Sequence, residues 1–228
     1  MRVDKDIVKH LGISDAARRV TAQPLDRLPR LISERCLEGS EGRLAREVAS
    51  SYAAGTSVTA ETFSMPRKGF GPRPVRLLSS RDRVAYDALV DKLRDSLPAE
   101  TRSPENWSTF RAFGRPGSDV TAKYLVTLDI ASMYEFVDHS ALRSELLIQT
   151  LDEEHVDAVI RLLGEAFGTT RGLPQMMASS DVLADAYLGV LERALLRHGY
   201  ALARYADDFR VLAPDWGTAN QIIELAAE

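Results

Sequence analysis

The residue string Tyr205-Ala206-Asp207-Asp208 places two carboxylates side by side between two strand-like runs, Tyr200–Tyr205 and Phe209–Leu212. Adjacent carboxylates at the tip of a tight hairpin repel each other unless a cation lies between them, and a divalent metal ion is the usual cation. Asp is also a favoured turn residue, so a plain Asp-Asp turn is the competing interpretation. The string alone does not decide between the two.

A third carboxylate, Asp129, stands near the end of the apolar run Leu125–Ile130. A buried, unpaired carboxylate is costly, so Asp129 is either solvated at a sheet edge or bound to a cation. If this run pairs with the hairpin 200–212, Asp129, Asp207 and Asp208 converge at one end of a sheet. Three hard oxygen ligands without a nearby His or Cys favour Mg²⁺, or Mn²⁺ in its place, over zinc. Paired ions of this kind assist attack of a hydroxyl on a phosphoryl group.

Hydrophobic periodicity and turn signals predict the elements that must position these residues. Apolar residues at helical spacing predict helices over 81–97, 139–150 and 152–167, and another from about Ser180 to Gly199. Residues 1–50 are expected to be mostly helical, with interruptions near Pro24 and Pro29, and β-like pieces are expected at 61–64 and 75–78. A loop that contains Pro98, Pro104 and Pro116 should come before a strand over 124–130. The hairpin 200–212 and a last helix from Thr218 complete the expected elements. This order predicts an α+β fold with a small antiparallel sheet backed by helices.

Composition narrows the class of protein. The 228 residues are 45% hydrophobic, enough for a substantial core, and contain no apolar run long enough to cross a membrane. The N-terminal residues lack the apolar stretch of a secretory signal, so we expect a cytoplasmic protein with no membrane partner. The single cysteine, Cys36, excludes an internal disulfide and a cysteine-based zinc cluster, and we expect it to be a small buried hydrophobe.

Charge is distributed unevenly along the chain. Residues 1–124 carry 22 Lys and Arg against 16 Asp and Glu, whereas residues 125–228 carry 7 against 17. A basic front half and an acidic back half suit a protein that binds polyanions with one part and metal ions with the other. The alternative is that the acidic residues only solvate helix faces.

Together, the motifs resemble those of reverse transcriptases, the RNA-directed DNA polymerases. Four blocks carry the resemblance, in the order that this family has. The first block is Arg67–Val75 with Arg81–Arg83, which resembles the fingers motifs of bacterial members. The three catalytic motifs of the family are resembled, in turn, by Asp129–His139, by Arg171–Gln175 with the following helix, and by Arg204–Phe209. The resemblance implies the fingers and palm of a right-hand polymerase. We therefore expect an N-terminal helical extension over 1–60, fingers over 61–123 and palm over 124–228, with the thumb absent.

The resemblance also implies a role for each matching residue. Asp129 and Asp207 would be the principal Mg²⁺ ligands and catalytic residues, with Asp208 a weaker partner. Tyr134 matches the gate under the incoming sugar that favours dNTPs over rNTPs, and Gln175 matches a residue lining the nucleotide pocket. The implied partners are an RNA template, a DNA or RNA primer and dNTPs, and the oligomeric state stays open.

The basic segment 66–83 suits a lid over a triphosphate, because Arg and Lys neutralise charge passing to the leaving group. Arg73 is the first candidate for the triphosphate contact and Lys68 the second, whereas Arg81 is also a candidate for a structural ion pair with Asp82. A solvated basic loop is the competing interpretation. Tyr134 as a core aromatic and Gln175 as an ordinary loop residue are the corresponding alternatives.

Two smaller features have a structural interpretation as well as a functional one. Asp138 and His139 invite an acid–base role, but Asp138 before a helical run fits an N-terminal cap. Trp107, Phe110 and Phe113 are candidates for stacking on bases, with packing of their own loop as the favoured interpretation.

The second motif departs from the family pattern, because Met176 stands where the family has Gly after Pro-Gln. The version Met176–Asp181 looks closer to the defence-associated and abortive-infection reverse transcriptases of bacteria. That likeness leaves two alternatives to templated synthesis open. One is template-independent or protein-primed DNA synthesis, and the other is a catalytically impaired palm that only binds nucleic acid or a partner.

Overall fold

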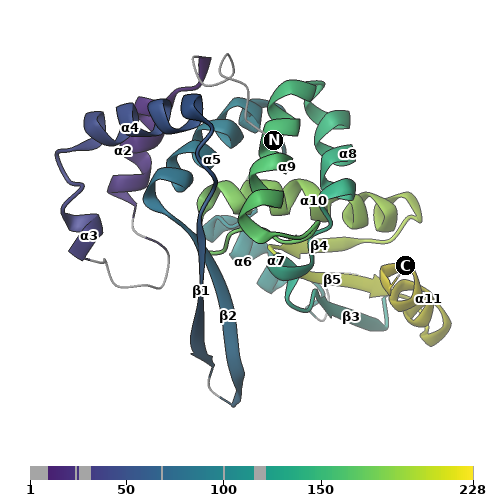
Figure 1. Ribbon diagram of the computed structural model, residues 1–228. Coiled ribbons are helices and arrows are strands. Elements are labelled where there is room, and N and C mark those ends of the chain that lie inside the picture. The colour runs from purple at the N-terminus through teal and green to yellow at the C-terminus, as the bar shows by residue number, and fades with distance from the viewer. Residues whose placement is uncertain are drawn as a thin grey trace. The chain divides into compact units, whose positions relative to one another are not determined.

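The computed structural model describes residues 10–23, 25, 32–67, 69–99, 101–115 and 122–227. It confirms the α+β class, with helices and two small antiparallel sheets (Figure 1). The chain divides into two compact units, each built from two separate stretches. Unit 1 combines Met1–Leu97 with Tyr134–Leu183, and unit 2 combines Pro98–Met133 with Ala184–Glu228. The expected division into three consecutive segments stays a prediction.

Unit 1 is built around helix α5 (Ser80–Leu93), whose residues are buried on nearly every side. Helices α2 (Ile13–Ala22), α4 (Glu41–Ala54) and α9 (Glu153–Phe167) all contact it. Its N-terminus is capped by Ser79, whose hydroxyl accepts the backbone N–H of Asp82. A helix enclosed in this way acts as the core of its unit, because its apolar residues face several partners.

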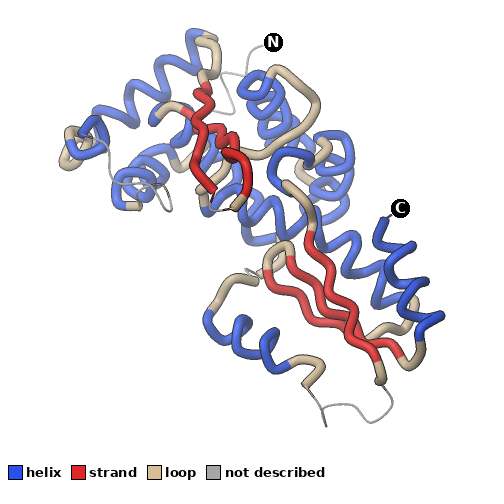
Figure 2. Tube along the Cα trace, turned by 90° about the horizontal axis from the view of Figure 1, so that it is seen from below, coloured by secondary structure: helices blue, strands red, loops and turns tan. Residues whose placement is uncertain are grey.

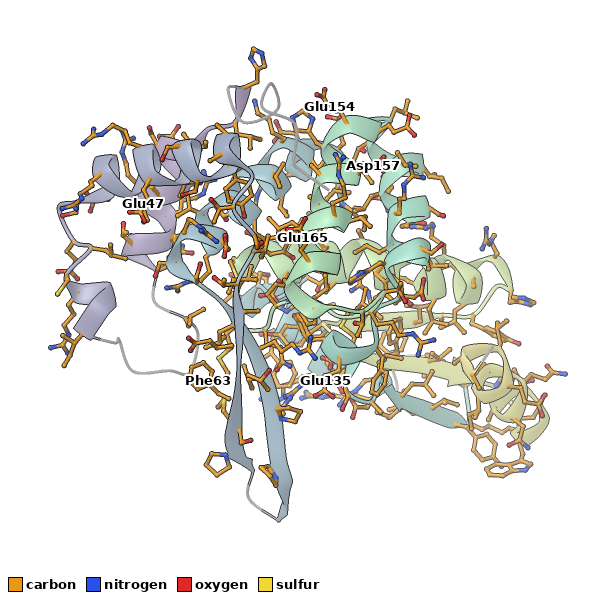
Figure 3. All side chains as sticks on the ribbon, in the orientation of Figure 1. Glu47, Phe63, Glu135, Glu154, Asp157 and Glu165 are labelled. Carbon is orange, nitrogen blue, oxygen red and sulfur yellow. The ribbon has the colours of Figure 1, made fainter. Side chains whose placement is uncertain are left out.

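Helices α8 (His139–Thr150) and α9 pack as neighbours in unit 1. Asp157 of α9, labelled in Figure 3, accepts a hydrogen bond from Nε of Arg143 in α8 at 2.6 Å. Asp138 caps α8 by accepting the N–H groups of Ser140 and Ala141, and His139 is buried with Nε2 2.8 Å from the Gly172 carbonyl. The structural interpretation of Asp138 and His139 is therefore confirmed.

The two β-like pieces predicted at 61–64 and 75–78 belong to one hairpin, which Figure 1 shows as two long paired strands. Strand β1 (Ala60–Arg67) pairs antiparallel with β2 (Phe70–Leu78), and the pairing shifts register between Met65 and Arg67. The base of the hairpin is part of the core, since Val75, Leu77 and Leu78 are buried.

Unit 2 contains a three-stranded antiparallel sheet in the order β3-β5-β4, seen side by side in Figure 2. Strands β3 (Tyr124–Asp129) and β4 (Leu202–Tyr205) flank the central β5 (Asp208–Ala213). Phe209, Val211 and Ala213 of β5 are buried at alternate positions, as expected for a strand with one face in a core. Helix α11 (Trp216–Ala227) contacts β3 and β5, and α6 (Pro104–Ala112) contacts β4.

Several local expectations differ from the structure. The predicted loop after Pro98 contains helix α6, with Ser103 as its cap and Pro104 in its first turn. The short helix α7 (Met133–Phe136) was also not predicted, whereas α3 (Ile32–Arg35) lies within the segment expected to be mostly helical. The expectation that Cys36 is buried is wrong: it is exposed, because it follows the four-residue α3 in a turn with no core face to pack against. Pro24 and Pro29 lie outside the described residues.

The longest described helix is α10 (Ala178–Arg197), and the boundary between the two units falls within it. Among the described residues, no helix is long and apolar enough to cross a membrane.

Candidate active site

Strand pairing brings the three predicted catalytic carboxylates to one end of the sheet of unit 2. In the antiparallel register of β3 and β5, Asp129 lies directly opposite Asp208. Asp207 precedes Asp208 in the turn between β4 and β5, and its carbonyl accepts the N–H of Ile130 at 3.4 Å. Antiparallel neighbours place opposite Cβ atoms about 4.5–5.5 Å apart, so Asp129 and Asp208 are close enough to interact.

The turn that carries the carboxylates has only two residues, Ala206 and Asp207, between the paired Tyr205 and Asp208. Ala206 has φ of 54°, in the left-handed region that favours glycine. Positive φ at a central position is common in two-residue hairpin turns, because it suits the twist of the flanking strands. The side chain at Ala206 therefore adds strain of about 1 kcal/mol beside the acids.

The acidic end of the sheet is electrostatically unfavourable for its own carboxylates. Burial, followed by the neighbouring charges of Asp207 and Asp129, raises the pKa of Asp208, and only Arg210 acts in the opposite direction. Asp129 is exposed at the edge strand β3, while Asp207 and Asp208 are half-buried. The charges of Asp207 and Asp129 thus act on Asp208, and Arg210 offsets part of their effect.

These carboxylates fit a divalent cation in their chemistry, because they supply hard oxygen donors and an uncompensated negative charge. Their side chains are not drawn together into one shell. Over the described part of the chain, no group of three or more His, Cys, Asp or Glu side chains is arranged to hold a metal ion.

Two of the predicted nucleotide-binding residues lie in a connected part of unit 1. Tyr134, in α7, is half-buried, its hydroxyl donates to Asp181 in the first turn of α10, and its carbonyl accepts the N–H of Leu173 at 2.7 Å. Gln175 is 7% exposed, and its amide donates to the Pro74 carbonyl of β2 at 3.2 Å. The segment around Gln175 is thereby attached both to α7 and to the β1–β2 hairpin.

Met176, which stands where the resembling family has Gly, has an unusual backbone conformation. Met176 has φ of 63°, so the chain adopts the left-handed conformation at the very position where the resembling family has Gly. The conformation that a glycine would favour is kept, and a partly exposed methionine side chain is added to it.

The basic residues of the segment 66–83 separate into distinct roles. Arg73, half-buried on β2, lies opposite Met65 in the hairpin, and Lys68 lies outside the described residues. Arg76 donates to the Phe167 carbonyl at 2.6 Å, and its guanidinium lies 4.9 Å from the centre of the Phe167 ring. These contacts make Arg76 part of the framework of unit 1.

Arg81 forms the structural ion pair that was its alternative role. It donates from Nε and Nη2 to Asp82 at 2.9 and 3.0 Å, and Asp82 is completely buried. Asp82 also accepts hydrogen bonds from Tyr52, Thr59 and Ser79. Burial tends to raise the pKa of Asp82, but the hydrogen bonds and the Arg81 charge prevail and lower it. This carboxylate therefore anchors α4, α5 and the segment that leads into strand β1.

Comparisons with known proteins found no matching family model. Trigger factor from Mycobacterium bovis is 28% identical over 122 residues, which cover 50% of this chain and 26% of that protein. Trigger factor from Mycobacterium tuberculosis matches at the same identity and over the same extent. The chain thus spans about a quarter of the length of these curated proteins.

A solved structure of apo telomerase from Candida tropicalis, truncated from the C-terminal domain, is similar with a TM-score of 0.49 and 12% identity, over 83% of this chain and 52% of that chain. At these values neither likeness assigns the chain to a family.

Two features of the site were missed from the sequence. Asp181, the acceptor for Tyr134, had no motif of its own, although its place in the first turn of α10 is an ordinary one for an acidic residue. Two aromatic residues of α6 contact the last residue of β4, Tyr205: the ring of Trp107 lies 4.8 Å and that of Phe110 6.0 Å from the ring of Tyr205. Packing is thus a confirmed role of Trp107 and Phe110, while Trp107 remains 42% exposed.

Proposed function

We propose that this chain is a nucleotidyltransferase, an RNA-directed DNA polymerase that adds dNTPs to a 3′-hydroxyl with divalent metal ions. The observation that carries the proposal is the register of the sheet in unit 2, which sets Asp129 opposite Asp208 with Asp207 in the adjoining turn. The raised pKa of Asp208 supports it, because burial and then the neighbouring charges of Asp207 and Asp129 disfavour the ionised form of this carboxyl group. The order of the four sequence blocks supports the same activity.

In this proposal Asp129 and Asp207 hold Mg²⁺, with Asp208 as a weaker ligand and Mn²⁺ as a substitute ion. When bound, such ions lower the pKa of the attacking hydroxyl and stabilise the charge on the departing pyrophosphate. The protein's contribution is to hold the carboxylates on a sheet end and a two-residue turn, whose backbone geometry is fixed by strand pairing.

The nucleotide-binding roles belong to residues of unit 1. Arg73 and Lys68 neutralise the triphosphate, Tyr134 lies under the sugar and excludes a 2′-hydroxyl, and Gln175 lines the nucleotide pocket. The burial of Gln175 and its bond to Pro74 favour an orienting part for this amide over a mobile loop position. A role in bacterial antiviral defence rests on the resemblance at Met176–Asp181 alone.

A second candidate function is template-independent or protein-primed DNA synthesis. The resemblance of Met176–Asp181 to the defence-associated reverse transcriptases permits it. An impaired palm that only binds nucleic acid or a partner is the third candidate, and Met176 favours it, because its side chain at φ of 63° takes space where the resembling family has Gly.

The test is incorporation of labelled dNTPs by the protein with Mg²⁺, with and without RNA template and primer. The wild type should give labelled DNA and Asp207→Ala should give none, while Glu154→Ala, an exposed position on α9, should match the wild type. Equal incorporation by wild type and Asp207→Ala would sink the catalytic assignment. Synthesis without template would select the second candidate, and nucleic-acid binding without synthesis the third.

A further inference from the structure

A buried ion-pair network in unit 2 lies directly behind the catalytic turn. Its centre is Asp185 of α10, whose side chain is completely buried. Asp185 accepts four hydrogen bonds: from Arg204 at 2.8 Å, from Arg102 at 3.2 Å, and from the hydroxyl and backbone N–H of Thr101 at 2.9 and 3.2 Å. A buried carboxylate persists only with such full compensation.

The network continues into the turn through the two partners of Asp185. Arg204 immediately precedes Tyr205-Ala206-Asp207-Asp208, its side chain is 3% exposed, and it donates to the Ala206 carbonyl at 3.3 Å. The Thr101 hydroxyl, which donates to Asp185, accepts the Ala206 N–H at 3.4 Å. Both backbone polar groups of Ala206 are therefore attached, through one intermediate side chain each, to a single carboxylate.

Ala206 is the residue at which this support is needed. Its φ of 54° is unfavourable for a residue with a Cβ atom, and such a conformation persists only where the surrounding structure imposes it. The same residue is followed by two adjacent carboxylates, and Asp129 lies opposite the second of them across the sheet. The Asp185 network holds the strained residue of this acidic turn by its backbone.

We propose that Asp185, acting through Arg204 and the Thr101 hydroxyl, is a positioning residue that holds the strained backbone of the Tyr205–Asp208 turn, which carries two of the proposed cation ligands. The inference rests on the proposed metal-dependent function of that turn. Asp185 does not itself contact the reacting groups. An alternative role is purely structural, in which the ion pairs only attach α10 to β4. Glu192 of α10 already provides such an attachment, since it accepts Nε of Arg204 at 2.8 Å.

Thr101 offers the sharper test, because Thr101→Val removes one hydroxyl at nearly constant shape and leaves both ion pairs of Arg204 in place. We expect hydrogen–deuterium exchange of the amides of residues 205–208 to become about three- to tenfold faster, the factor that one hydrogen bond provides. Mn²⁺ affinity, followed by the electron spin resonance signal of free Mn²⁺, should weaken by a similar factor. Thr101→Ser, which keeps the hydroxyl, should restore both values, and Thr109→Val, an exposed hydroxyl of α6, should change neither.

Asp185→Asn should have the larger effect, at least about tenfold on both measurements, because charged hydrogen bonds are roughly twice as strong as neutral ones. In nucleotide incorporation we expect kcat to fall and the KM for dNTP to stay within about twofold, since nucleotide contacts are not altered. The matched control is Asp87→Asn in unit 1, a 7%-exposed carboxylate that also binds an arginine and a hydroxyl. It should lower thermal stability without faster exchange at 205–208.

The two proposals fail in different ways. If the wild type neither binds Mn²⁺ nor incorporates dNTPs, the proposed function is wrong, and amide exchange at 205–208 still decides the role of Asp185. If Thr101→Val lowers the melting temperature but leaves both the exchange of the turn and Mn²⁺ affinity unchanged, the network is only structural and the inference is overturned. Should Asp185→Asn not fold, the Thr101 variants alone distinguish a positioning role from a structural one.

Discussion

Replacing Asp208 by asparagine should stabilise the protein in buffer free of divalent cations. The side chain keeps its shape, but one of three neighbouring negative charges is removed from the sheet end. With Asp129 directly opposite, the two charges lie about 6 Å apart, which corresponds to about 0.7 kcal/mol in water and about 3 kcal/mol at an effective dielectric constant of 20. Because Asp129 is exposed and Arg210 offsets part of the repulsion, we expect a net gain of about 1–2 kcal/mol.

For a chain of this size, that gain corresponds to a melting temperature higher by about 2–8 °C. Urea unfolding followed by far-ultraviolet circular dichroism gives the free energy of unfolding directly. The difference should shrink in 1 M NaCl, where the screening length is about 3 Å, shorter than the charge separation. Asp215→Asn is the matched control: the Thr218 N–H, which donates to Asp215 at 2.8 Å, lowers the pKa of this carboxyl group, so removing the favourable charge should give no gain in stability.

Added Mg²⁺ should reverse the order of stability. A ligand that binds only the folded state stabilises it in proportion to RT ln(1 + [L]/Kd), so the wild type should gain more than Asp208→Asn, which has lost one ligand. The predicted repulsion is refuted if Asp208→Asn is less stable than the wild type at low salt without divalent cations. That result would mean that the carboxylate has favourable partners of its own and is an ordinary turn residue.

Three further predictions concern unit 1. The pKa of Asp82 is lower in the folded protein than in the unfolded chain, so the ionised carboxylate stabilises the fold above the unfolded pKa of about 3.9, and this stabilisation is lost as pH falls through the folded pKa. In Asp82→Asn, the free energy of unfolding should therefore depend less on pH in this acidic range. Parallel curves of unfolding free energy against pH for the wild type and the variant, measured in urea, would contradict this. Met176→Gly should be more stable to urea than Met176→Ala by about 1 kcal/mol, because alanine keeps the unfavourable Cβ at φ of 63°, and equal stabilities would show that the turn has relaxed. Tyr134→Ala should reduce the preference for dNTP over rNTP, measured as the ratio of the two kcat/KM values. Asp181→Asn, which removes the charge from the acceptor of the Tyr134 hydroxyl, should reduce this ratio less. An unchanged ratio in Tyr134→Ala would exclude the gate role.

Features with a local cause were predictable from the sequence. The strand at Asp129 and the hairpin at 200–212 follow from short apolar runs bounded by turn residues, and antiparallel pairing then places Asp129 near Asp208. The cap at Asp138 follows from residue type and position before an apolar periodic stretch. Helix α6 was predictable in principle, because Ser103 and Pro104 form an ordinary start signal, but the surrounding prolines favoured a loop.

Features with a tertiary cause were not predictable. The left-handed backbone at Met176 and Ala206 runs against the preference of both residue types, so it is imposed by contacts made elsewhere in the fold. The partners of Asp185 come from positions 83 or more residues earlier and 19 residues later in the chain, and no periodicity marks such pairs. Exposure of Cys36 depends on where a very short helix ends, which is the least predictable property of an element.

The turn between β4 and β5 combines a strained backbone with neighbouring like charges, and this combination favours a binding role for the turn. A two-residue hairpin selected only for stability would have Asn-Gly or Gly at its strained position and no adjacent like charges. This turn instead has alanine at φ of 54° and acids at Asp207 and Asp208, with a third acid opposite. A fully compensated buried carboxylate, Asp185, supports that strained backbone from behind. Backbone strain and like-charge repulsion both reduce stability, so a turn that served only folding would lack them. Their presence, together with a hydrogen-bond network that supports the strained residue, is expected where binding requires this backbone geometry.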